Sequence, residues 1–429
     1  MARSSRRRAT RGEPAVQRLH AGWALAGALV LTVVLIITTV VVAPWRGGRD
    51  DRPARAVPPE AVFSSPGFEG AVGGGPPPAD GVTPAAPALP TDGAAGGRTM
   101  GFSAGELIGL SPAALNARVA AMAATGATWT RWDIPWPAVQ PDGPDSWDWS
   151  LPDRVLAAMN AHGLYSLPIL DYTPAWARVA GCGVDACAPA RTDDFVRFAT
   201  AAVTRYAPAG VRAWEIWNEP NLAFFWAPNP DADAYAALLK AVTRAIHAAQ
   251  PGAVVLAGGL APAQTVQGQV HPVDFLRRIY DTAGAASFDG VAMHPYSFPA
   301  LPADGLVWSG WSQLNQLRSL MVARGDSAKG IWITEFGAPT GGKGSAVTLA
   351  ARRYDRGTDH VDEAFQAQTA KEGWAQAAAA TWIHGFFWYS FADLGTDPDK
   401  PEDHLGIVRA DGSLKPSYGV LRDAFQSAR

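Results

Sequence analysis

The sequence is poor in cysteine: its 429 residues include only Cys182 and Cys187, both in the loop-like segment GCGVDAC. The nearest histidine in the sequence, His162, lies well upstream, so the two thiols have no companion ligand at a metal-binding spacing. No such spacing occurs elsewhere in the sequence, and we predict neither a metal nor a cofactor. In an exported chain, two neighbouring cysteines favour a local disulfide.

An excess of positive charge is also missing. The chain holds 36 Lys and Arg against 39 Asp and Glu, a formal net charge of -3, which gives no electrostatic basis for binding nucleic acid. A glycine-rich nucleotide turn is absent after the first predicted strand, and GGKGS at 341–345 lacks the spacing of a phosphate loop. These absences argue against an open nucleotide-binding sheet and leave other α/β folds.

A long uncharged apolar run, GWALAGALVLTVVLIITTVVVA, is present at 22–43. Roughly 20 apolar residues suffice for a helix to cross a bilayer, whereas the apolar core of a cleaved signal peptide spans about 7 to 15. We therefore predict a transmembrane signal anchor at 22–43, with a cleaved and secreted form as the alternative. Six arginines precede this run and four follow soon after it, so the positive-inside rule places residues 1–21 in the cytoplasm.

Residues 44–97 are rich in Pro, Gly and Ala, contain no Tyr or Ile, and have no Trp beyond Trp45. Such a segment cannot bury enough apolar surface to offset the entropy of folding, and we predict a disordered linker. Treated as a flexible coil, about fifty residues span an r.m.s. distance on the order of 40 Å. The linker would hold the following domain away from the membrane.

From residue 98 onward, short apolar runs of β type alternate with helical stretches. Ser111 and Pro112 mark one helix start as an N-cap followed by proline at the first helical position, and Gly126 stops that helix. Eight strands, each followed by a helix, in about 330 residues are the pattern of a (β/α)₈ TIM barrel. The sequence therefore predicts the α/β class, with one barrel domain at 98–429. The predicted strands are 99–102, 128–133, 164–170, 211–217, 253–257, 288–294, 330–335 and 385–390.

Polar side chains follow several of these strands, at the end where a barrel carries its catalytic residues. Glu219 follows the fourth strand and Glu335 ends the seventh, and a turn signal comes soon after each. Two carboxyl groups across a cleft, one protonated and one ionised, are the equipment for cleaving a glycosidic bond. A separation of about 5 to 5.5 Å predicts retention of anomeric configuration, and about 6.5 to 9.5 Å predicts inversion.

Glu215 lies on the same predicted strand, in AWEIWNEPN at 213–221. Strict alternation along the strand points residues 215, 217 and 219 in one direction and places Glu215 roughly 13 Å below Glu219. A charge buried in the barrel needs a partner. We therefore predict that Glu215 forms a structural ion pair or hydrogen bond and takes no part in catalysis.

The motifs WNEPN at 217–221, HPYS at 294–297 and ITEFG at 333–337 resemble the signature of the clan A glycoside hydrolases, the retaining (β/α)₈ enzymes. The segments 130–156 and 406–423 are most similar to family 39 and family 5 members. The resemblance extends over residues 99–425. It implies an O-glycosyl hydrolase that acts by double displacement.

The resemblance also implies roles for the matching residues. Glu219 would be the general acid/base, and Glu335 the nucleophile that forms a glycosyl-enzyme. Arg131 and Tyr296 would hold Glu335 ionised and oriented, since a cation and a hydroxyl donor both favour a carboxylate. Pairing of Arg131 with Glu215 inside the barrel is the alternative.

Four further residues are expected to contact the sugar. The resemblance implies that Asn218 hydrogen-bonds the 2-hydroxyl, an interaction that strengthens in the oxocarbenium-like transition state, and that His294 lines the site. It makes Trp388 the platform under the sugar ring, with a place in the core as the alternative because FFWYSF is apolar on both faces. Trp136 lies in a predicted strand-to-helix loop, where an aromatic face suits a sugar subsite.

Together these features predict a membrane-tethered retaining glycosidase that hydrolyses an extracytoplasmic polysaccharide or oligosaccharide. A catalytically silent glycan-binding barrel and a transglycosylase using the same site are the alternatives. The presence of both carboxylates disfavours the silent barrel, because glycan binding alone does not require them. A transglycosylase would form the same covalent intermediate and pass it to a sugar instead of water.

Overall fold

The computed structural model of the chain describes residues 99–351 and 359–429. The predicted cytoplasmic segment 1–21, the predicted anchor at 22–43 and the predicted linker at 44–97 lie outside the described residues. Across 99–351 and 359–429, no helix combines the length and the apolarity needed to cross a membrane.

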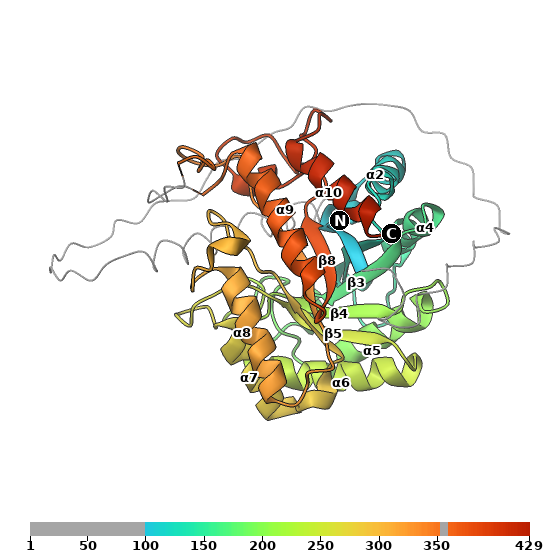
Figure 1. The fold of residues 1–429 in the computed structure, drawn as a ribbon. Helices are drawn as coiled ribbons and strands as arrows, with labels where there is room; N and C mark the ends of the chain where they lie inside the picture. Colours follow the sequence, from blue (N-terminus) through green and yellow to red (C-terminus); the bar gives the residue numbers. More distant parts are fainter. Residues whose placement is uncertain (1–98, 352–358) are drawn as a thin grey trace, which may run out of the picture.

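Within the described residues, eight strands form one closed barrel in which each strand runs parallel to its neighbours in chain order (Figure 1). The predicted (β/α)₈ architecture is therefore confirmed, and each predicted strand overlaps an observed one. The last strand closes the ring by pairing with the first. The strands are β1 Thr99–Ser103, β2 Trp129–Pro135, β3 Tyr165–Asp171, β4 Ala213–Asn218, β5 Val254–Leu260, β6 Gly290–Met293, β7 Ile331–Phe336 and β8 Ile383–Tyr389.

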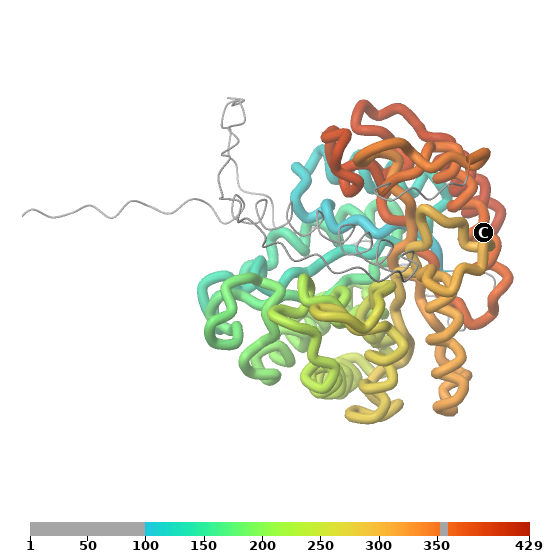
Figure 2. The backbone as a smooth tube through the Cα atoms, turned by 90° about the vertical axis from the view of Figure 1, so that its left-hand side faces the viewer, coloured from blue at the N-terminus to red at the C-terminus, as the bar shows by residue number. Residues whose placement is uncertain are grey.

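Helices surround the barrel, as the two perpendicular views show (Figures 1 and 2). Neighbouring helices pack on one another, α5 on α6, α6 on α7 and α9 on α10. The helices are α2 Pro112–Ala124, α3 Trp136–Val139, α4 Ser150–Ala161, α5 Thr192–Tyr206, α6 Ala232–Ala249, α7 Pro272–Ala283, α8 Gly310–Ala323, α9 Glu363–Ala379 and α10 Pro416–Ser427. Short 3-10 helices lie at Gly105–Gly109, Ala175–Ala177, Ala285–Ser287, Pro302–Asp304 and Pro401–His404.

Local sequence explains where these helices begin. The Ser111 hydroxyl accepts a hydrogen bond from the Ala114 N–H at the start of α2, which confirms the predicted N-cap. Helix α7 starts in the same manner, with His271 as N-cap and proline at its first position. Its Phe275 and Ile279 are four residues apart and both buried, so one stripe of the helix covers the barrel.

The interior of the barrel is filled by side chains, with an apolar layer below a polar one. The apolar layer consists of Trp129, Leu167, Ala213, Leu256, Ala292, Trp332 and Phe387, all buried. Two residues farther along their strands, toward the carboxyl ends, Arg131 and Glu215 begin the polar layer. The barrel is therefore a packed core whose functional groups lie toward its C-terminal end.

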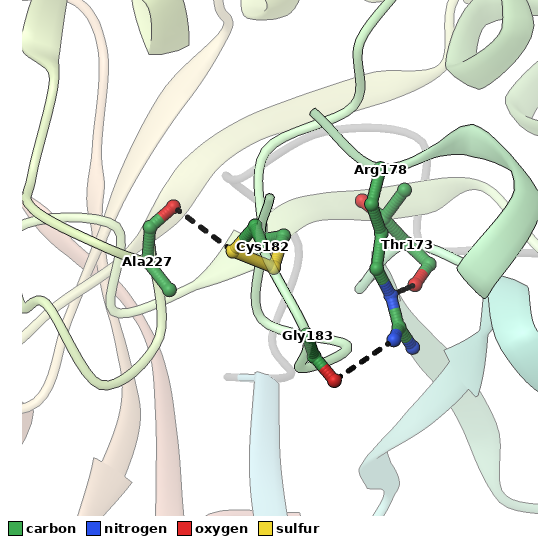
Figure 3. Close-up of a disulfide and its surroundings, with 6 residues drawn as sticks. Thr173, Arg178, Cys182, Gly183 and Ala227 are labelled. Carbon is green, nitrogen blue, oxygen red and sulfur yellow. Dashed lines mark hydrogen bonds between the residues drawn. A yellow bond between two sulfur atoms is a disulfide. The ribbon is translucent and has the colours of Figure 1, made fainter. Parts of the chain in front are cut away.

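The predicted disulfide joins Cys182 and Cys187 in the loop after β3, with Cα atoms 6.0 Å apart. Figure 3 shows the surroundings: Arg178 donates to the carbonyl oxygens of Thr173 and Gly183 across the loop. The Cys182 sulfur lies 4.0 Å from the Ala227 carbonyl oxygen, a contact without a proton, since a disulfide sulfur cannot donate. The bridge and the arginine together fix the loop at the rim of the barrel.

Candidate active site

The end of β4 breaks the alternation of side chains on which the sequence prediction relied. Trp217 and Glu219 have φ angles of 70° and 44°, a left-handed conformation that is uncommon for residues other than glycine. The Trp217 ring packs outward against Phe195 of α5, with centroids 5.8 Å apart. The predicted common direction of residues 215, 217 and 219 is therefore wrong, because the turn at Trp217 directs Asn218 and Glu219 into the site instead.

Strand β7 changes direction in a similar way. Trp332 lies in the apolar layer inside the barrel, while Phe336 packs outward against Trp311 of α8. The pairing register with β8 shifts between Ile333 and Phe336. As a result, Thr334 and Glu335, adjacent in sequence, both present polar atoms to the interior. Both predicted catalytic glutamates thus sit just beyond a local break in strand geometry.

Arg131 on β2 is the centre of the polar layer. Its Nε and Nη2 atoms donate to the two oxygens of Glu215, each at 2.8 Å. Nη2 also reaches Asn218 Oδ1 at 2.8 Å, and Nη1 donates to Ser103 at 3.0 Å and to Glu335 at 2.5 Å. Both contacts weighed for Arg131 are therefore present, and the predicted ion pair of Glu215 is confirmed. All five guanidinium N–H groups are engaged.

Glu335 is oriented by donors on both of its oxygens. Oε1 accepts from Arg131, and Oε2 accepts from the Tyr296 hydroxyl at 2.8 Å. Burial raises the pKa of Glu335, whereas the Arg131 charge and the Tyr296 hydrogen bond oppose that rise. The predicted contacts of Arg131 and Tyr296 with Glu335 are thus present, and they favour its ionised form.

Glu219 has a different environment. It is buried, one oxygen lies 2.8 Å from His294 Nδ1, and its Oε2 has no hydrogen-bond partner among the described residues. Burial raises the pKa of Glu219 well above its usual value, and the Glu335 charge adds to the rise. Because no cation holds Glu219 directly, a single proton shared between the two carboxyl groups resides on Glu219 rather than on Glu335.

His294 connects Glu219 to the buried Glu215. Its Nε2 lies 3.2 Å from the Thr334 hydroxyl, which is 3.5 Å from Glu215 Oε1. A carboxylate only accepts, so Thr334 donates to Glu215 and His294 Nε2–H donates to Thr334. Burial, together with the Arg131 charge, holds the pKa of His294 well below its usual value. The neutral ring therefore presents an unprotonated Nδ1 that accepts a hydrogen bond from protonated Glu219.

Gly259 on β5 makes room for this histidine. A β-carbon at position 259 would overlap His294 Nε2. The backbone of Gly259 also serves the site, because its N–H donates to Glu215 Oε1 at 2.9 Å and its carbonyl accepts from the Glu219 N–H at 2.9 Å. The signal for this site in the sequence is the glycine pair that ends AGG at 257–259.

Substitution of Gly259 by Ala is expected to displace the buried His294 ring. The overlap should cost about 1–3 kcal/mol of unfolding free energy and, by misplacing the partner of Glu219, about a hundredfold in kcat/KM. Urea unfolding and initial rates measure the two effects. Gly419→Ala is the matched control, since a β-carbon there meets no atom within 4 Å. An active Gly259→Ala protein with unchanged stability would contradict the account of the histidine.

Glu219, His294 and Glu335 bring ligand-type atoms within 4.8 Å of one another. Three such groups could hold a metal ion. However, both Glu335 oxygens and both His294 nitrogens already have partners in the polar layer. The 4.8 Å limit also applies to one pair of oxygens from Glu219 and Glu335. It lies just below the range of about 5 to 5.5 Å for retaining glycosidases and far below the range for inverting ones.

Two predicted sugar contacts disagree with the structure. Trp388 is fully buried and packs outward on Phe336, with ring centroids 5.8 Å apart. Trp136 is also fully buried and stacks on Phe198 at 5.7 Å. Both tryptophans therefore belong to the core, because the apolar layer between strands and helices encloses their faces and leaves none for a sugar ring.

Tyr389, not Trp388, is the aromatic residue that faces the interior at the end of β8. Side chains alternate along β8, so Phe387 and Tyr389 both face the interior of the barrel. Tyr389 is half-buried and packs against a cluster of buried apolar residues that includes Tyr296. Burial and the nearby Glu335 charge raise the pKa of Tyr389 well above its usual value, so its hydroxyl stays protonated. Because FFWYSF is apolar on both faces, the sequence does not indicate which of its side chains point into the barrel.

The chain is similar to solved structures of glycoside hydrolases. A family 39 glycoside hydrolase from Bacteroides cellulosilyticus matches with a TM-score of 0.57 at 22% identity, over 76% of this chain and 63% of that one. A monomeric β-xylosidase from Caulobacter crescentus matches with a TM-score of 0.56 at 19% identity, over 76% and 68%. An exo-β-1,4-mannosidase from an Opitutaceae bacterium matches with a TM-score of 0.53 at 18% identity, over 78% of this chain and 60% of that one.

These matches confirm the resemblance to family 39 and family 5 of clan A at the level of the fold. The chain spans less than two thirds of the length of the Bacteroides protein. The sequence matches no protein-family model, and no curated protein matches it.

Proposed function

We propose that the protein is a retaining glycosidase in which Glu335 is the nucleophile and Glu219 the general acid/base. The observation that carries the proposal is the pair of carboxyl groups with oxygens within 4.8 Å of each other and opposite surroundings. Glu335 has an arginine and a tyrosine hydroxyl as partners, whereas Glu219 keeps one oxygen without a partner in the described part of the chain. That free oxygen suits proton delivery to a leaving group.

The mechanism follows from these surroundings. A Glu335 oxygen attacks the anomeric carbon as the bond to the leaving oxygen breaks, and Glu219 protonates that oxygen. Water then loses a proton to Glu219 and attacks the anomeric carbon, which releases Glu335. Asn218, held by Arg131, is the proposed partner of the 2-hydroxyl. The unprotonated Nδ1 of His294 favours protonated Glu219 in the first step and strengthens Glu219 as a base in the second.

Substitution of Thr334 by Val is expected to shift the basic limb of the pH profile of kcat/KM to lower pH. Activity falls as pH rises through the pKa of Glu219, which must be protonated. Without the Thr334 hydroxyl, His294 is free to carry its proton on Nδ1 and donate to ionised Glu219, which lowers that pKa by about half to one unit. Thr334→Ser retains the hydroxyl and should keep the wild-type profile. A basic limb that stays in place or moves upward in Thr334→Val would refute the proposed tautomer.

The setting of the enzyme is also a proposal. The apolar run at 22–43 and the linker at 44–97 support a membrane-tethered barrel outside the cytoplasm that acts on a polysaccharide or oligosaccharide. Sodium carbonate extraction of cells that produce the full chain should leave the protein with the membranes. Recovery of a soluble secreted form beginning near residue 57 would exclude the anchor.

The activity is tested with the full chain on aryl glycosides and on neutral, amino and acidic polysaccharides. Wild type should release sugar from at least one of them. Glu219→Ala should lose about 10²–10⁴-fold with a poor leaving group, and azide should restore turnover of an activated aryl glycoside, whereas Glu215→Ala should not respond to azide. Binding without turnover would identify a silent glycan-binding barrel, and transfer to an added sugar in preference to water would identify a transglycosylase.

A further inference from the structure

Asp133 and Asp171 form a second pair of carboxyl groups in the barrel, and the mechanism above does not use them. Asp133 lies two residues beyond Arg131 on β2, and Asp171 ends β3, where it is one register step closer to the rim. Each carboxyl group shifts the pKa of the other, so the two side chains lie near one another. The charges of Arg131 and Glu335 both act on Asp133, so the pair borders the space next to Glu335.

Among the described residues, no N–H or O–H group donates to either oxygen of Asp171, although this side chain is fully buried. Two neighbouring carboxyl groups that are both buried do not readily ionise together. Burial raises the pKa of both groups, to about 6 for Asp133, and the nearby Asp133 charge adds to the rise at Asp171. Asp171 is therefore the group that holds a proton, and Asp133 is the ionised group with acceptor capacity left over.

Arg131 does not neutralise this pair by direct contact. Its five N–H groups are committed to Ser103, Glu215, Asn218 and Glu335. Buried acceptors without donors are costly, and a ligand that supplies donors removes that cost. A sugar carboxylate, in contrast, would bring a further negative charge to a place where several carboxyl groups share one engaged cation.

We propose that Asp133 and Asp171 form a subsite beside Glu335 that accepts the O–H or N–H donors of a neutral or amino sugar and excludes a uronic acid. This inference rests on the proposed glycosidase function and narrows its substrate class. The half-buried Tyr389 hydroxyl, held protonated, adds one more donor or acceptor at the same rim. Specificity of this kind arises because a misplaced carboxylate is left without a partner.

The test is calorimetric binding to the full chain carrying Glu219→Gln, which keeps the charge of a protonated glutamate and prevents turnover. The probes are cello-, xylo- and manno-oligosaccharides, chitosan oligosaccharides, and oligogalacturonides as the acidic series. At least one neutral or amino series should bind at least about tenfold more tightly than the acidic series. The neutral and amino arms distinguish hydroxyl donors from ammonium donors.

Adding Asp133→Asn should weaken binding of the preferred series by about tenfold, because an amide replaces the charged acceptor. Asp281→Asn is the matched control: it makes the same change at an exposed residue of helix α7, outside the subsite, so affinity should stay within about twofold. Unchanged melting temperatures exclude a folding effect. Equal affinity for oligogalacturonides, no binding of any series, or an Asp133→Asn protein that binds like its parent would overturn the inference.

This result is separable from the proposed function. Selective binding that depends on Asp133, together with no turnover of any glycan by the wild-type chain, would leave the subsite in place and remove the glycosidase. Turnover that is abolished by Glu335→Gln, together with oligogalacturonide binding as tight as that of neutral sugars, would leave the glycosidase and remove the subsite.

Discussion

Replacing Glu335 with Gln is expected to lower kcat/KM for glycoside cleavage by about 10⁴-fold or more. The substitution keeps the shape of the side chain but removes the nucleophile, and loss of a covalent catalyst has effects of this order. Tyr296 can still donate to the amide oxygen, so the site should stay assembled. Initial rates with an activated aryl glycoside measure the loss.

The same variant carries an internal check on the pair of carboxyl groups. The Glu335 charge contributes to the raised pKa of Glu219, so its removal should lower that pKa. Carbon NMR of the labelled glutamate side chains follows the titration directly. Activity within tenfold of wild type, or a Glu219 pKa that does not fall, would contradict the assigned roles.

Replacing Arg131 with Met is expected to reduce the unfolding free energy by about 3–5 kcal/mol, because it leaves Glu215 and Glu335 as uncompensated charges inside the barrel. Arg131 is 2% exposed and Glu215 is fully buried, so water does not screen the loss. The predicted change is therefore one of the largest that a single substitution produces in a protein. Urea unfolding followed by tryptophan fluorescence provides the measurement.

Arg278→Met is the matched control, since it removes an arginine from an exposed ion pair with Asp233. Exposed pairs add little to stability, and the unfolding midpoint should hardly move. If Arg131→Met unfolds at the same urea concentration as wild type, then Arg131 does not hold the polar layer together. If Arg278→Met destabilises the protein as much as Arg131→Met does, a general loss of positive charge is the cause.

The barrel was predictable from the sequence because its strands are short apolar runs separated by helix-capping signals. The position of the site then followed from a general rule: in a barrel of this type, polar residues at the C-terminal ends of the strands form the site. Arg131, Glu219 and Glu335 meet in the structure although 88 and 116 residues separate them along the chain. No local sequence pattern indicates that these residues are neighbours, because only closure of the barrel brings them together.

The sequence did not reveal which side chains of β4, β7 and β8 point into the barrel, because this depends on local backbone geometry and on how the strands pair. The left-handed turn at Trp217 and the register shift in β7 break the alternation that the strand prediction assumed. Trp388 and Tyr389 are adjacent aromatic residues, and only the position of β8 against its neighbours decides which one faces the interior. The hydrogen-bond chain through His294 and Thr334 joins three strands, so it too emerged only from the assembled barrel.

The most direct test of the account is trapping of the glycosyl-enzyme. The full chain is incubated with 2,4-dinitrophenyl 2-deoxy-2-fluoro-glycosides of xylose, glucose and mannose, digested, and analysed by mass spectrometry. Retention by double displacement predicts a covalent fluoroglycosyl group on the peptide that contains Glu335, and none on the same peptide from Glu335→Gln. A label on Glu219 or Glu215, or glycoside turnover with no covalent intermediate and an inverted product, would contradict it.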